Sequence, residues 1–358
     1  MRIAFDVSPL SHPLLGIGNY MQGSLKGLAE VSAAKHEIVA FAPTSIRGPE
    51  RIRAALAGID IELRTWRLPF SHALRTGWSI TSHPATERLI GRFDVLHFSD
   101  WMYPPQRGGV RATTIHDLVP LHHPEWTTPR TRSMHSRKYR NAAQTCDVVF
   151  VNSAYTGRDV TETLGISAER VRVARPAAKD VFRADGTAAD LGAQYILTVA
   201  TLEPRKNLQA LVEAHRLLGG DLLLAVVGAE GWGEQALLDD SRIRRLGYVS
   251  DEELARLYRG AAVAVYPSRF EGFGIPVIEA MACGVPVVVS SHESLDEASG
   301  QAAVRADPDD SKAIAAAIER ALAESERLVD AGLEHSQSFT WRAVGETFLR
   351  GYEEAASR

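Results

Sequence analysis

The chain has 358 residues, of which 45% are hydrophobic and 23% are charged, as in an ordinary soluble globular protein. At roughly 100–200 residues per domain, this length predicts two domains. The formal net charge of −4 argues against a protein that binds nucleic acid through bulk positive charge, because such domains carry a strong basic excess.

The N-terminus and the cysteines favour a cytoplasmic protein. Arg2 is followed at once by the strand-like run Ile-Ala-Phe-Asp-Val, which is too short for the apolar core of a signal peptide. No apolar run approaches the length of a membrane span. Cys146 and Cys283 are far apart and form neither a disulfide framework nor a metal-binding motif, so we expect two buried thiols.

Short apolar runs rich in β-forming residues alternate with longer helical patterns along the chain. The expected strands of the first half are Arg2–Val7, Glu37–Ala42, Ile61–Trp66, Asp94–Phe98, Ala112–Ile115, Asp147–Val151 and Val171–Ala174. Helices are expected between them, for example at Asn19–Glu30 and Arg132–Ala143. The expected strands of the second half are Tyr195–Ala200, Leu222–Val227, Ile243–Leu246, Val263–Tyr266 and Val285–Ser290. The helices expected there are Leu208–Leu218, Asp251–Ala261, Ile275–Ala282 and Asp310–Ala323.

This alternation predicts α/β domains with parallel sheets and helices on both faces. One doubly wound sheet needs about six strands, so the chain has enough for two. A polar stretch at Arg175–Gly192 is expected to link the domains, and the last helix, Trp341–Ala355, is expected to cross back onto the first. The expected domains are therefore 1–178 and 179–338, with residues 339–358 as the returning helix. Ligands of such sheets bind at the carboxyl ends of the strands.

The segment after the expected strand Val263–Tyr266 has the residues that a ligand-binding turn and helix require. Gly272 and Gly274 let the backbone approach a ligand without Cβ obstruction. Pro276 suits a first helical turn, where a missing N–H costs nothing, and Gly284 suits a left-handed cap at the end of the helix. The segment is therefore predicted to be a strand, a turn and a helix.

Two glutamates flank this turn. The free amides around Phe273–Val277 predict an anion site suited to a diphosphate. Glu279, expected in the first helical turn, can accept both hydroxyls of a ribose, and Glu271 can accept hydroxyls of a sugar. The alternative interpretation is an ordinary strand–turn–helix with two solvated glutamates.

The whole string Glu271-Gly-Phe-Gly-Ile-Pro-Val-Ile-Glu279-Ala-Met-Ala-Cys-Gly-Val-Pro resembles the signature of the retaining GT-B glycosyltransferases of family four, also called group 1. The resemblance implies two Rossmann-like doubly wound domains facing a deep cleft. The N-terminal domain would bind the acceptor, and the C-terminal domain would bind a nucleotide-sugar donor. It further implies that Glu271 and the amides of Gly272, Phe273 and Gly274 contact the donor sugar, and that Glu279 binds the ribose.

A second motif, Thr201-Leu-Glu-Pro-Arg205-Lys206-Asn207, directly follows the expected strand Tyr195–Ala200 and resembles the family's Glu-Pro-Arg-Lys-Asn motif. A leaving nucleoside diphosphate develops negative charge, which a fixed Lys and Arg stabilise. Cations are disfavoured at a helix N-terminus, so the Arg205–Lys206 pair also indicates an anionic ligand. Many relatives carry a second Arg just after the strand, where this chain has Thr201 or Leu202. Arg205 would therefore have to stabilise more of the charge on the leaving diphosphate.

A third motif, His116-Asp117, ends the expected strand Ala112–Ile115. The family places a His here beside the donor sugar, so His116 is expected to hydrogen-bond a sugar hydroxyl and shape the reaction centre. The alternative is a structural histidine. Asp117 would orient the imidazole or cap the following turn.

Two backbone positions complete the expected donor site. The run Gly16-Ile-Gly-Asn-Tyr after the first strand resembles the family's glycine loop, in which the amide of Gly16 would meet the diphosphate. Met21 stands where a dinucleotide fingerprint needs a third Gly, which argues against a nicotinamide enzyme. Val249, just before the helix Asp251–Ala261, resembles the main-chain position that holds the nucleobase.

No metal and no cofactor are expected. Asp307-Pro-Asp309 has the Asp-x-Asp pattern of metal-dependent transferases of another fold, but it precedes a helix, and capping is the better interpretation. In the family, Lys206, Arg205 and helix amides would do the work of a metal ion. No covalent nucleophile is evident, and the family is thought to react at one face of the sugar.

Two basic and aromatic regions lie in the expected acceptor domain. One is Arg130–Arg140 with Trp126 upstream, and the other contains Arg64, Trp66, Arg67, Arg75 and Trp78. Such faces bind anionic bilayers, so a lipid-linked acceptor and peripheral contact with the inner membrane surface form one interpretation. The other is a solvated helix face with a few buried tryptophans.

The expected activity is hexose transfer from a GDP- or UDP-sugar to a glycan, lipid-linked or small-molecule acceptor. Asp6-Val-Ser-Pro-Leu and the Gly16 run resemble subgroups rich in bacterial mannosyltransferases, which favours GDP-mannose. One alternative is a sugar phosphorylase or synthase on the same fold. Another is a protein that binds sugar nucleotides without turning them over.

Overall fold

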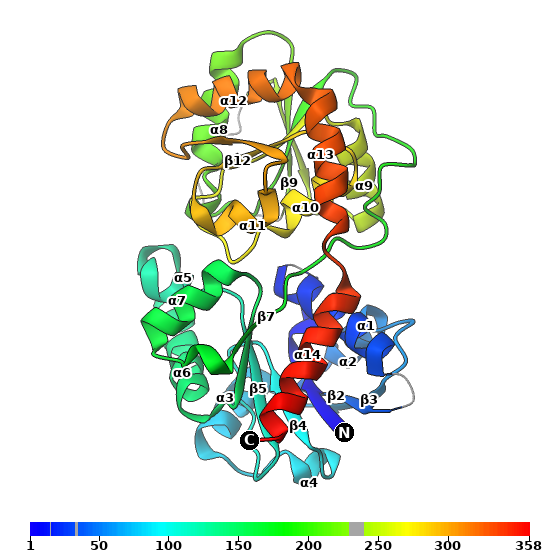
Figure 1. Cartoon of the computed structure of the whole chain (residues 1–358), viewed down its shortest axis with the longest axis vertical. Coiled ribbons are helices and arrows are strands. Elements are labelled where there is room, and N and C mark those ends of the chain that lie inside the picture. The colour runs from blue at the N-terminus through cyan, green and yellow to red at the C-terminus, as the bar shows by residue number, and fades with distance from the viewer. Residues whose placement is uncertain (15, 33–34, 229–239) are drawn as a thin grey trace. The chain divides into compact units, whose positions relative to one another are not determined.

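The computed structural model describes residues 1–14, 16–32, 35–228 and 240–358. It divides into two compact units (Figure 1), and each is described here by itself. Unit 1 contains Met1–Pro176 and Thr340–Arg358, and unit 2 contains Ala177–Phe339. The expected domain boundaries after residues 178 and 338 lie close to the boundaries between the two units. Leu15, which precedes the Gly16 run, lies outside the described residues.

Unit 1 is built on a seven-stranded sheet in the order β3-β2-β1-β4-β5-β6-β7, in which all neighbouring strands are parallel. Its strands are β1 (Arg2–Asp6), β2 (Glu37–Thr44), β3 (Glu62–Arg67), β4 (Val95–Phe98), β5 (Val110–Ile115), β6 (Val148–Val151) and β7 (Val171–Val173). The central strands are buried at every position, as expected for a parallel sheet covered on both faces. The strand order reverses between β1 and β4, which is the arrangement of a doubly wound fold.

The helices of unit 1 include the last helix of the chain. They are α1 (Gly16–Ser32), α2 (Gly48–Ala55), α3 (Ser71–Thr81), α4 (Glu87–Ile90), α5 (Val119–His122), α6 (Pro129–Thr145), α7 (Ala154–Leu164) and α14 (Trp341–Ala356), with 3₁₀ turns η1 (Ser8–Ser11), η2 (Pro124–Trp126) and η3 (Ala168–Arg170). Helices α1 and α14 lie side by side (Figure 1). A Cβ on Gly27 would lie 1.8 Å from the backbone oxygen of Trp341, and a Cβ on Gly345 would lie 2.3 Å from the backbone of Gly27. Glycine is therefore what lets the two backbones meet.

A buried polar contact also fixes α14 on the sheet. His97 on β4 is fully buried, and its Nδ1 lies 2.5 Å from the Tyr352 hydroxyl while its Nε2 lies 2.9 Å from the Thr114 hydroxyl. The imidazole stacks on Phe5 at 4.3 Å between ring centroids. Burial, followed by the positive charge of Lys138, holds the pKa of His97 well below its usual range.

Unit 2 is built on a six-stranded parallel sheet in the order β10-β9-β8-β11-β12-β13. Its strands are β8 (Tyr195–Val199), β9 (Leu223–Val227), β10 (Ile243–Gly247), β11 (Val263–Tyr266), β12 (Val287–Ser290) and β13 (Ala303–Ala306). Its helices are α8 (Leu208–Leu218), α9 (Asp251–Gly260), α10 (Ile275–Ala282), α11 (Asp296–Ser299), α12 (Ser311–Ala323) and α13 (Ser325–Gln337), with 3₁₀ turns η4 (Pro204–Lys206) and η6 (Glu293–Leu295).

The sheet of unit 2 has a core on each face. Alternate residues of β9 point to opposite sides: Ala225 and Val227 pack with α9 and α10, whereas Leu224 and Val226 pack with α8 and α12. The two apolar clusters explain why this strand is a continuous hydrophobic run in the sequence. They also fix the helices that follow each strand and so position the loops at the carboxyl edge.

Four local expectations differ from the structure. The Gly16 run is the first part of α1 and not a loop. Most of the expected linker, Arg175–Gly192, belongs to unit 2, where Phe182 and Ala189 are buried in the core. Strand β13 and helix α13 were not expected. β13 escapes notice because it has four residues and includes the charged Arg305.

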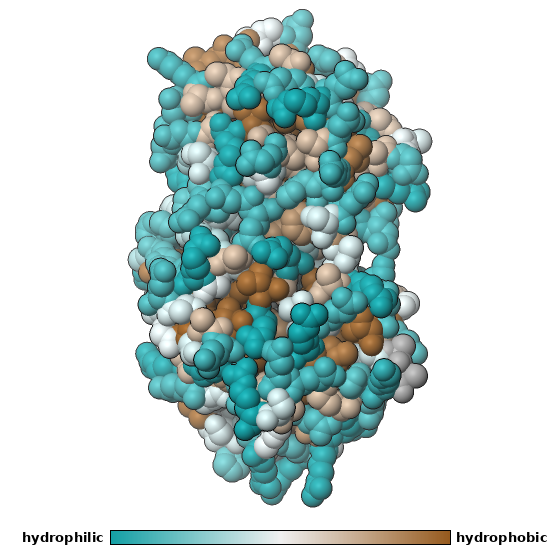
Figure 2. Space-filling view, viewed as in Figure 1, coloured by the Kyte–Doolittle hydropathy of each residue, from teal (hydrophilic) through white to brown (hydrophobic). Residues whose placement is uncertain are grey.

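No helix among the described residues is both long and apolar enough to span a bilayer. The face of the molecule in Figure 2 is dominated by hydrophilic side chains, with hydrophobic side chains gathered in small groups.

Candidate active site

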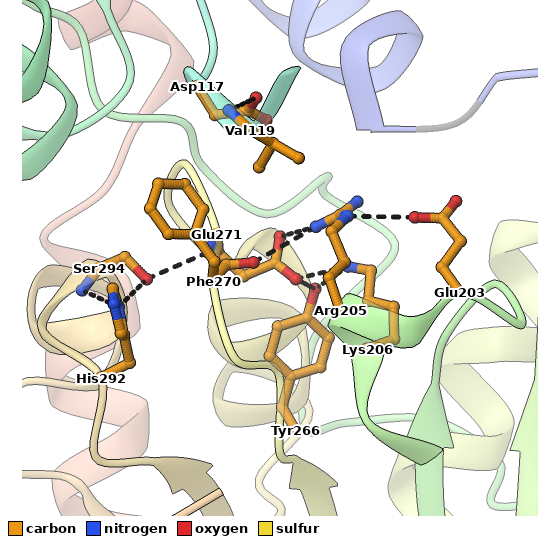
Figure 3. Close-up of polar contacts among 10 residues, drawn as sticks. All are labelled: Asp117, Val119, Glu203, Arg205, Lys206, Tyr266, Phe270, Glu271, His292 and Ser294. Atoms are coloured by element: carbon orange, nitrogen blue, oxygen red, sulfur yellow. Dashed lines mark hydrogen bonds and ion pairs between the residues drawn. The ribbon is translucent and has the colours of Figure 1, made fainter. Parts of the chain in front are cut away.

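A cluster of opposite charges surrounds the buried Glu271 at the carboxyl edge of the unit 2 sheet (Figure 3). Lys206 Nζ lies 2.7 Å from Glu271 Oε1, and Arg205 Nη1 lies 2.9 Å from Glu271 Oε2. The Tyr266 hydroxyl donates to Glu271 Oε1 at 3.1 Å. Glu203 Oε2 accepts from Arg205 Nε at 3.0 Å. The structure therefore brings together three of the predicted site residues, Arg205, Lys206 and Glu271.

The local backbone explains why the two cations point into this cluster. Arg205 and Lys206 lie in the 3₁₀ turn η4, between β8 and α8. Asn207 follows with a left-handed φ of 55° and donates from Nδ2 to the carbonyl oxygens of Pro267 and Pro308, at 3.2 and 2.5 Å. The side-chain amide thus ties the turn to the loops after β11 and β13, and this holds the two cations against Glu271.

Charge and burial act against each other in the cluster. Burial by itself would raise the pKa of Glu271, but Arg205 and then Lys206 outweigh it and lower the pKa to about 2. Burial, followed by the charge of Arg205, lowers the pKa of Lys206 from its ordinary value, and Glu271 opposes that shift. Three hydrogen bonds use most of the four acceptor positions of the Glu271 carboxylate. Glu271 is therefore an ionised anchor for the two cations.

The turn after Glu271 presents backbone amides. Gly274 has a φ of 103°, and a Cβ there would lie 2.6 Å from Leu295, so this position needs glycine. No described residue accepts a hydrogen bond from the amides of Phe273, Gly274 or Ile275. Gly272 begins the turn, and the Phe273 side chain is buried in the core, so both of these predicted residues offer only backbone to a ligand. The amides at the start of α10 form a site suited to an anion.

Glu279 lies one turn further along α10 than expected. The helix begins at Ile275, so Glu279 is in its second turn and not its first. It is 5% exposed, and its carboxylate has no hydrogen-bond or ion-pair partner among the described residues. Burial, followed by the charge of Asp251, raises the pKa of Glu279 to about 8. A buried carboxyl group without a partner is costly, so it is suited to an incoming hydrogen-bond donor.

Val249 and Gly16 lie at element boundaries. Val249 follows β10, packs against the core of unit 2, and precedes the α9 cap Ser250, which accepts from the Glu253 amide at 3.2 Å. Gly16 is the exposed first residue of α1 in unit 1, and a Cβ there would meet nothing within 4 Å. Gly16 is therefore not required by packing among the described residues.

His116 lies at the carboxyl end of β5 in unit 1. Its Nε2 is buried with no hydrogen-bond partner among the described residues, and its ring contacts Tyr20 edge-on at 5.0 Å between centroids. Burial, followed by the charges of Lys138 and His135, lowers the pKa of His116 to about 3, so the imidazole is neutral. Asp117 Oδ1 accepts from the Val119 amide at 3.1 Å, which supports the capping interpretation of this residue.

Three polar residues at these edges were missed in the sequence. Tyr266 ends β11 and donates to Glu271, and Ser294 Oγ accepts from the Glu271 amide at 3.1 Å. Lys138 on α6 is buried and donates to the carbonyl oxygens of Ser99 and Thr114, at 3.1 and 2.5 Å. The available signal was their position in a parallel sheet, with Tyr266 at the carboxyl end of β11 and Ser294 just after β12. Nothing in the sequence marks Lys138, which looks like one more charge on an exposed helix.

The Asp-x-Asp pattern forms a turn and an ion pair, and its neighbour Asp310 caps the helix that follows. Asp307 Oδ1 accepts from the Asp309 amide at 2.9 Å, and Asp309 pairs with Arg269 at 2.8 Å. Asp310 accepts from the amides of Lys312 and Ala313, at 2.9 and 3.1 Å, and so caps α12. Within the part of the chain that the structure describes, no group of three or more His, Cys, Asp or Glu side chains is arranged to hold a metal ion.

Two family models match the chain in succession. The model described as Glycosyltransferase Family 4 matches residues 16–178, and the model described as Glycosyl transferases group 1 matches residues 184–334. The D-inositol 3-phosphate glycosyltransferase of Geodermatophilus obscurus is 30% identical over 318 residues, which cover 74% of this chain and 67% of that protein. The chain belongs to the group 1 glycosyltransferases of family 4.

This glycosyltransferase also resembles proteins along its whole length. O-antigen chain mannosyltransferase B of Escherichia coli is 29% identical over 395 residues, which cover 99% of this chain and 100% of that protein. The Anabaena protein HepE, solved in complex with UDP and glucose, has a TM-score of 0.72 at 14% identity and covers 99% of this chain and 100% of its own. The fold of the glycosyltransferase is the GT-B architecture with two Rossmann-like domains, as the sequence predicted.

Proposed function

We propose that this glycosyltransferase transfers a hexose from a nucleoside diphosphate sugar to a glycan or lipid-linked acceptor, with retention of configuration and without a metal ion. The observation that carries the proposal is the ion cluster of unit 2, in which Arg205 and Lys206 are held against Glu271. Beside it, the amides of Phe273, Gly274 and Ile275 have no acceptor among the described residues. Fixed cations and amides in a buried site stabilise a leaving diphosphate, because the charge develops where they already point.

The proposed reaction takes place at one face of the sugar. The bond between the anomeric carbon and the diphosphate oxygen breaks, and the electron pair leaves with the diphosphate. The acceptor hydroxyl oxygen forms its bond to the same carbon from the same face, and its proton passes to the departing phosphate oxygen. Lys206 and Arg205 offset the growing charge on the diphosphate, as a metal ion does in other transferases. In this scheme Glu271 is no nucleophile, since its role is to fix both cations.

The remaining predicted residues bind the donor. We propose that the Glu279 carboxylate accepts the ribose hydroxyls, and that the backbone at Val249 holds the base. The amides of Gly272, Phe273 and Gly274 bind diphosphate and sugar, and Gly16 adds one more amide from unit 1. The neutral imidazole of His116 hydrogen-bonds the transferred sugar, since an uncharged ring can both donate and accept at physiological pH.

We propose GDP-mannose as the donor and a polysaccharide-type acceptor, with a cytoplasmic location. The name of the E. coli relative, an O-antigen chain mannosyltransferase, supports mannose and a glycan acceptor, and its match spans the whole chain. The UDP and glucose of the Anabaena structure keep a UDP-sugar as the alternative donor. A phosphorylase or synthase on the same fold is the second candidate, and phosphate-dependent cleavage of a glycoside would distinguish it.

The donor site is tested by thermal shift of the purified protein with UDP, GDP, ADP and their sugars. The proposal expects GDP and GDP-mannose to raise the melting temperature most. If no nucleotide stabilises the protein, the donor-site assignment is wrong. Donor binding without transfer or slow donor hydrolysis would instead indicate a binding protein that is not an enzyme.

The role of the cations is tested by Lys206→Ala. Loss of one donor to a developing charge costs about 10²–10³ in kcat, so turnover should fall at least that far. Lys312→Ala, which removes an exposed lysine on α12 of the same unit, is the control and should leave turnover unchanged. Near-normal turnover of Lys206→Ala, with its fold intact by circular dichroism, would refute the assignment. Lys206→Arg should recover part of the loss, because it keeps the charge.

A further inference from the structure

Unit 1 has an open cavity of about 980 Å³ beyond the carboxyl ends of β2 and β3. Three segments line it: the loop into α2, the loop into α3 with its first turns, and the first half of α6. None of the residues proposed above to bind the donor is among its lining residues. The cavity is at the upper end of the size range of small-molecule sites.

The cavity concentrates positive charge in a chain whose formal net charge is −4. Arg47, Arg51, Arg130 and Arg137 line it, and none of them forms an ion pair with a carboxylate among the described residues. Arg51 donates only to a backbone oxygen at 3.2 Å, and the Arg130 guanidinium lies 2.9 Å from a nitrogen of His72. Four guanidinium groups without a counter-charge repel one another, so the cavity is suited to an anion. Guanidinium groups match the oxygens of a phosphate.

The rim of the same cavity is apolar and unusually exposed. Ile46 and Phe70 line it with 66% and 88% of their surface exposed. Phe70 also has a left-handed φ of 51°, which is uncommon for a bulky side chain. No burial of its ring offsets this strain, so the folded chain alone gives no reason for a phenylalanine here.

We propose that this cavity binds the phosphate headgroup of an anionic lipid at a bilayer surface. The arginines contact the phosphate, while Phe70 and Ile46 enter the boundary between headgroups and acyl chains, where an apolar side chain beside a cation is favoured. This inference rests on the proposed transfer to a lipid-linked acceptor, because a protein held on the bilayer by unit 1 meets acceptors that are anchored there. It replaces the broader basic–aromatic expectation, since Arg75 and Trp78 are buried.

The first test is flotation of the full chain with vesicles of phosphatidylcholine, alone or mixed with phosphatidylglycerol. Arg51→Gln/Arg137→Gln removes two cavity arginines from α2 and α6. Arg53→Gln/Arg140→Gln removes two exposed arginines from the same helices that do not line the cavity. At about fivefold per arginine, the cavity pair should bind mixed vesicles roughly 25-fold more weakly. The control pair should bind like the unchanged protein. Equal losses for both pairs would overturn the proposal, because binding would then follow only the overall charge.

The second test is Phe70→Asn. Asparagine tolerates a left-handed φ better than phenylalanine, so the variant should melt at the same temperature or higher while its vesicle binding falls about tenfold. Unchanged vesicle binding overturns the proposal. Binding of soluble inorganic phosphate by a protein that does not bind vesicles also overturns the proposal, because the ligand of the cavity would then not be a lipid. A GDP thermal shift on the same samples separates failure of this proposal from failure of the donor site. Loss of vesicle binding with GDP binding intact bears on the cavity alone, and loss of GDP binding with vesicle binding intact bears on the donor site alone.

Discussion

Replacing Glu279 with Gln should make the protein more stable at high pH while weakening its donor site. The folded-state pKa of Glu279 is about 8, raised from 4.5 by burial, so folding favours the protonated acid. Stability from this group is fully present below pH 4.5 and is lost as the pH rises through 8. At about 1.4 kcal/mol per unit, the whole window corresponds to at most ~5 kcal/mol. Glutamine resembles the protonated acid and does not titrate, so the variant avoids this loss.

The assay is urea denaturation followed by circular dichroism, at a series of pH values from about 5 to about 9. The free energy of unfolding of the unchanged protein should fall more steeply with pH than that of Glu279→Gln, and the two should converge at the acid end. Glu319→Gln, at an exposed position of α12, is the control and should run parallel to the unchanged protein. Parallel curves for Glu279→Gln as well would show that Glu279 ionises in the folded state as it does in the unfolded chain.

The same variant tests the proposed ribose contact. A carboxylate can accept from two hydroxyls, whereas a glutamine amide offers one acceptor oxygen, and a hydrogen bond to a charged group contributes about 1.5–3 kcal/mol. GDP affinity should therefore fall at least tenfold at pH 8 and above. Because binding to the carboxylate displaces its proton below pH 8, the affinity of the unchanged protein should rise as the pH approaches 8. GDP affinity that does not depend on pH would exclude the carboxylate from the binding site.

Two further predictions concern the packing of α14 in unit 1. Gly27→Ala should destabilise the protein by about 1–3 kcal/mol, because the new Cβ clashes with the α14 backbone. Gly77→Ala is the control: a Cβ there on α3 meets nothing within 4 Å, so the variant should be more stable by up to about 1 kcal/mol. Chemical denaturation measures both changes, and changes of the same sign would refute the close approach of α1 and α14. Tyr352→Phe should cost about 1–3 kcal/mol by leaving Nδ1 of the buried His97 without its partner, while Tyr248→Phe, at a 60% exposed ring, should cost nothing measurable in the same assay.

The parallel strands could be predicted from the sequence because burial on both faces leaves a continuous apolar run, as in β9. The pattern fails where burial is partial. Strand β13 alternates between buried and half-buried residues over only four positions, so the single charged residue Arg305 is enough to break its apolar pattern in the sequence. The Gly16 run resembles the family's glycine loop in sequence, yet it is the first part of a helix. The glycines that α14 packs against, Gly23 and Gly27, come later in the same helix, and this packing offsets the low helix propensity of glycine.

The candidate site shows the same limit. The sequence identifies Arg205, Lys206 and Glu271 as charged residues at the ends of strands, but it gives no sign that they pair with one another. That pairing adds a second role, anchoring the two cations, to the sugar contact expected of Glu271. The cavity of unit 1 has arginines on two helices far apart in the chain, such as Arg51 and Arg137. Only the fold brings them together, so residue spacing carries no signal for it.

Unit 1 is discontinuous in the chain, and this has a consequence for synthesis on the ribosome. Its last helix, α14, comes after all of unit 2, so the α1 surface that packs on α14 stays uncovered until α14 itself has been synthesised. Unit 2 is continuous from Ala177 to Phe339 and can complete its core earlier. A ribosome that stalls or stops before Thr340 would therefore release a chain with a finished unit 2 and an unfinished unit 1. Such a chain exposes apolar helix surface to quality-control proteases while it still carries an intact ion cluster.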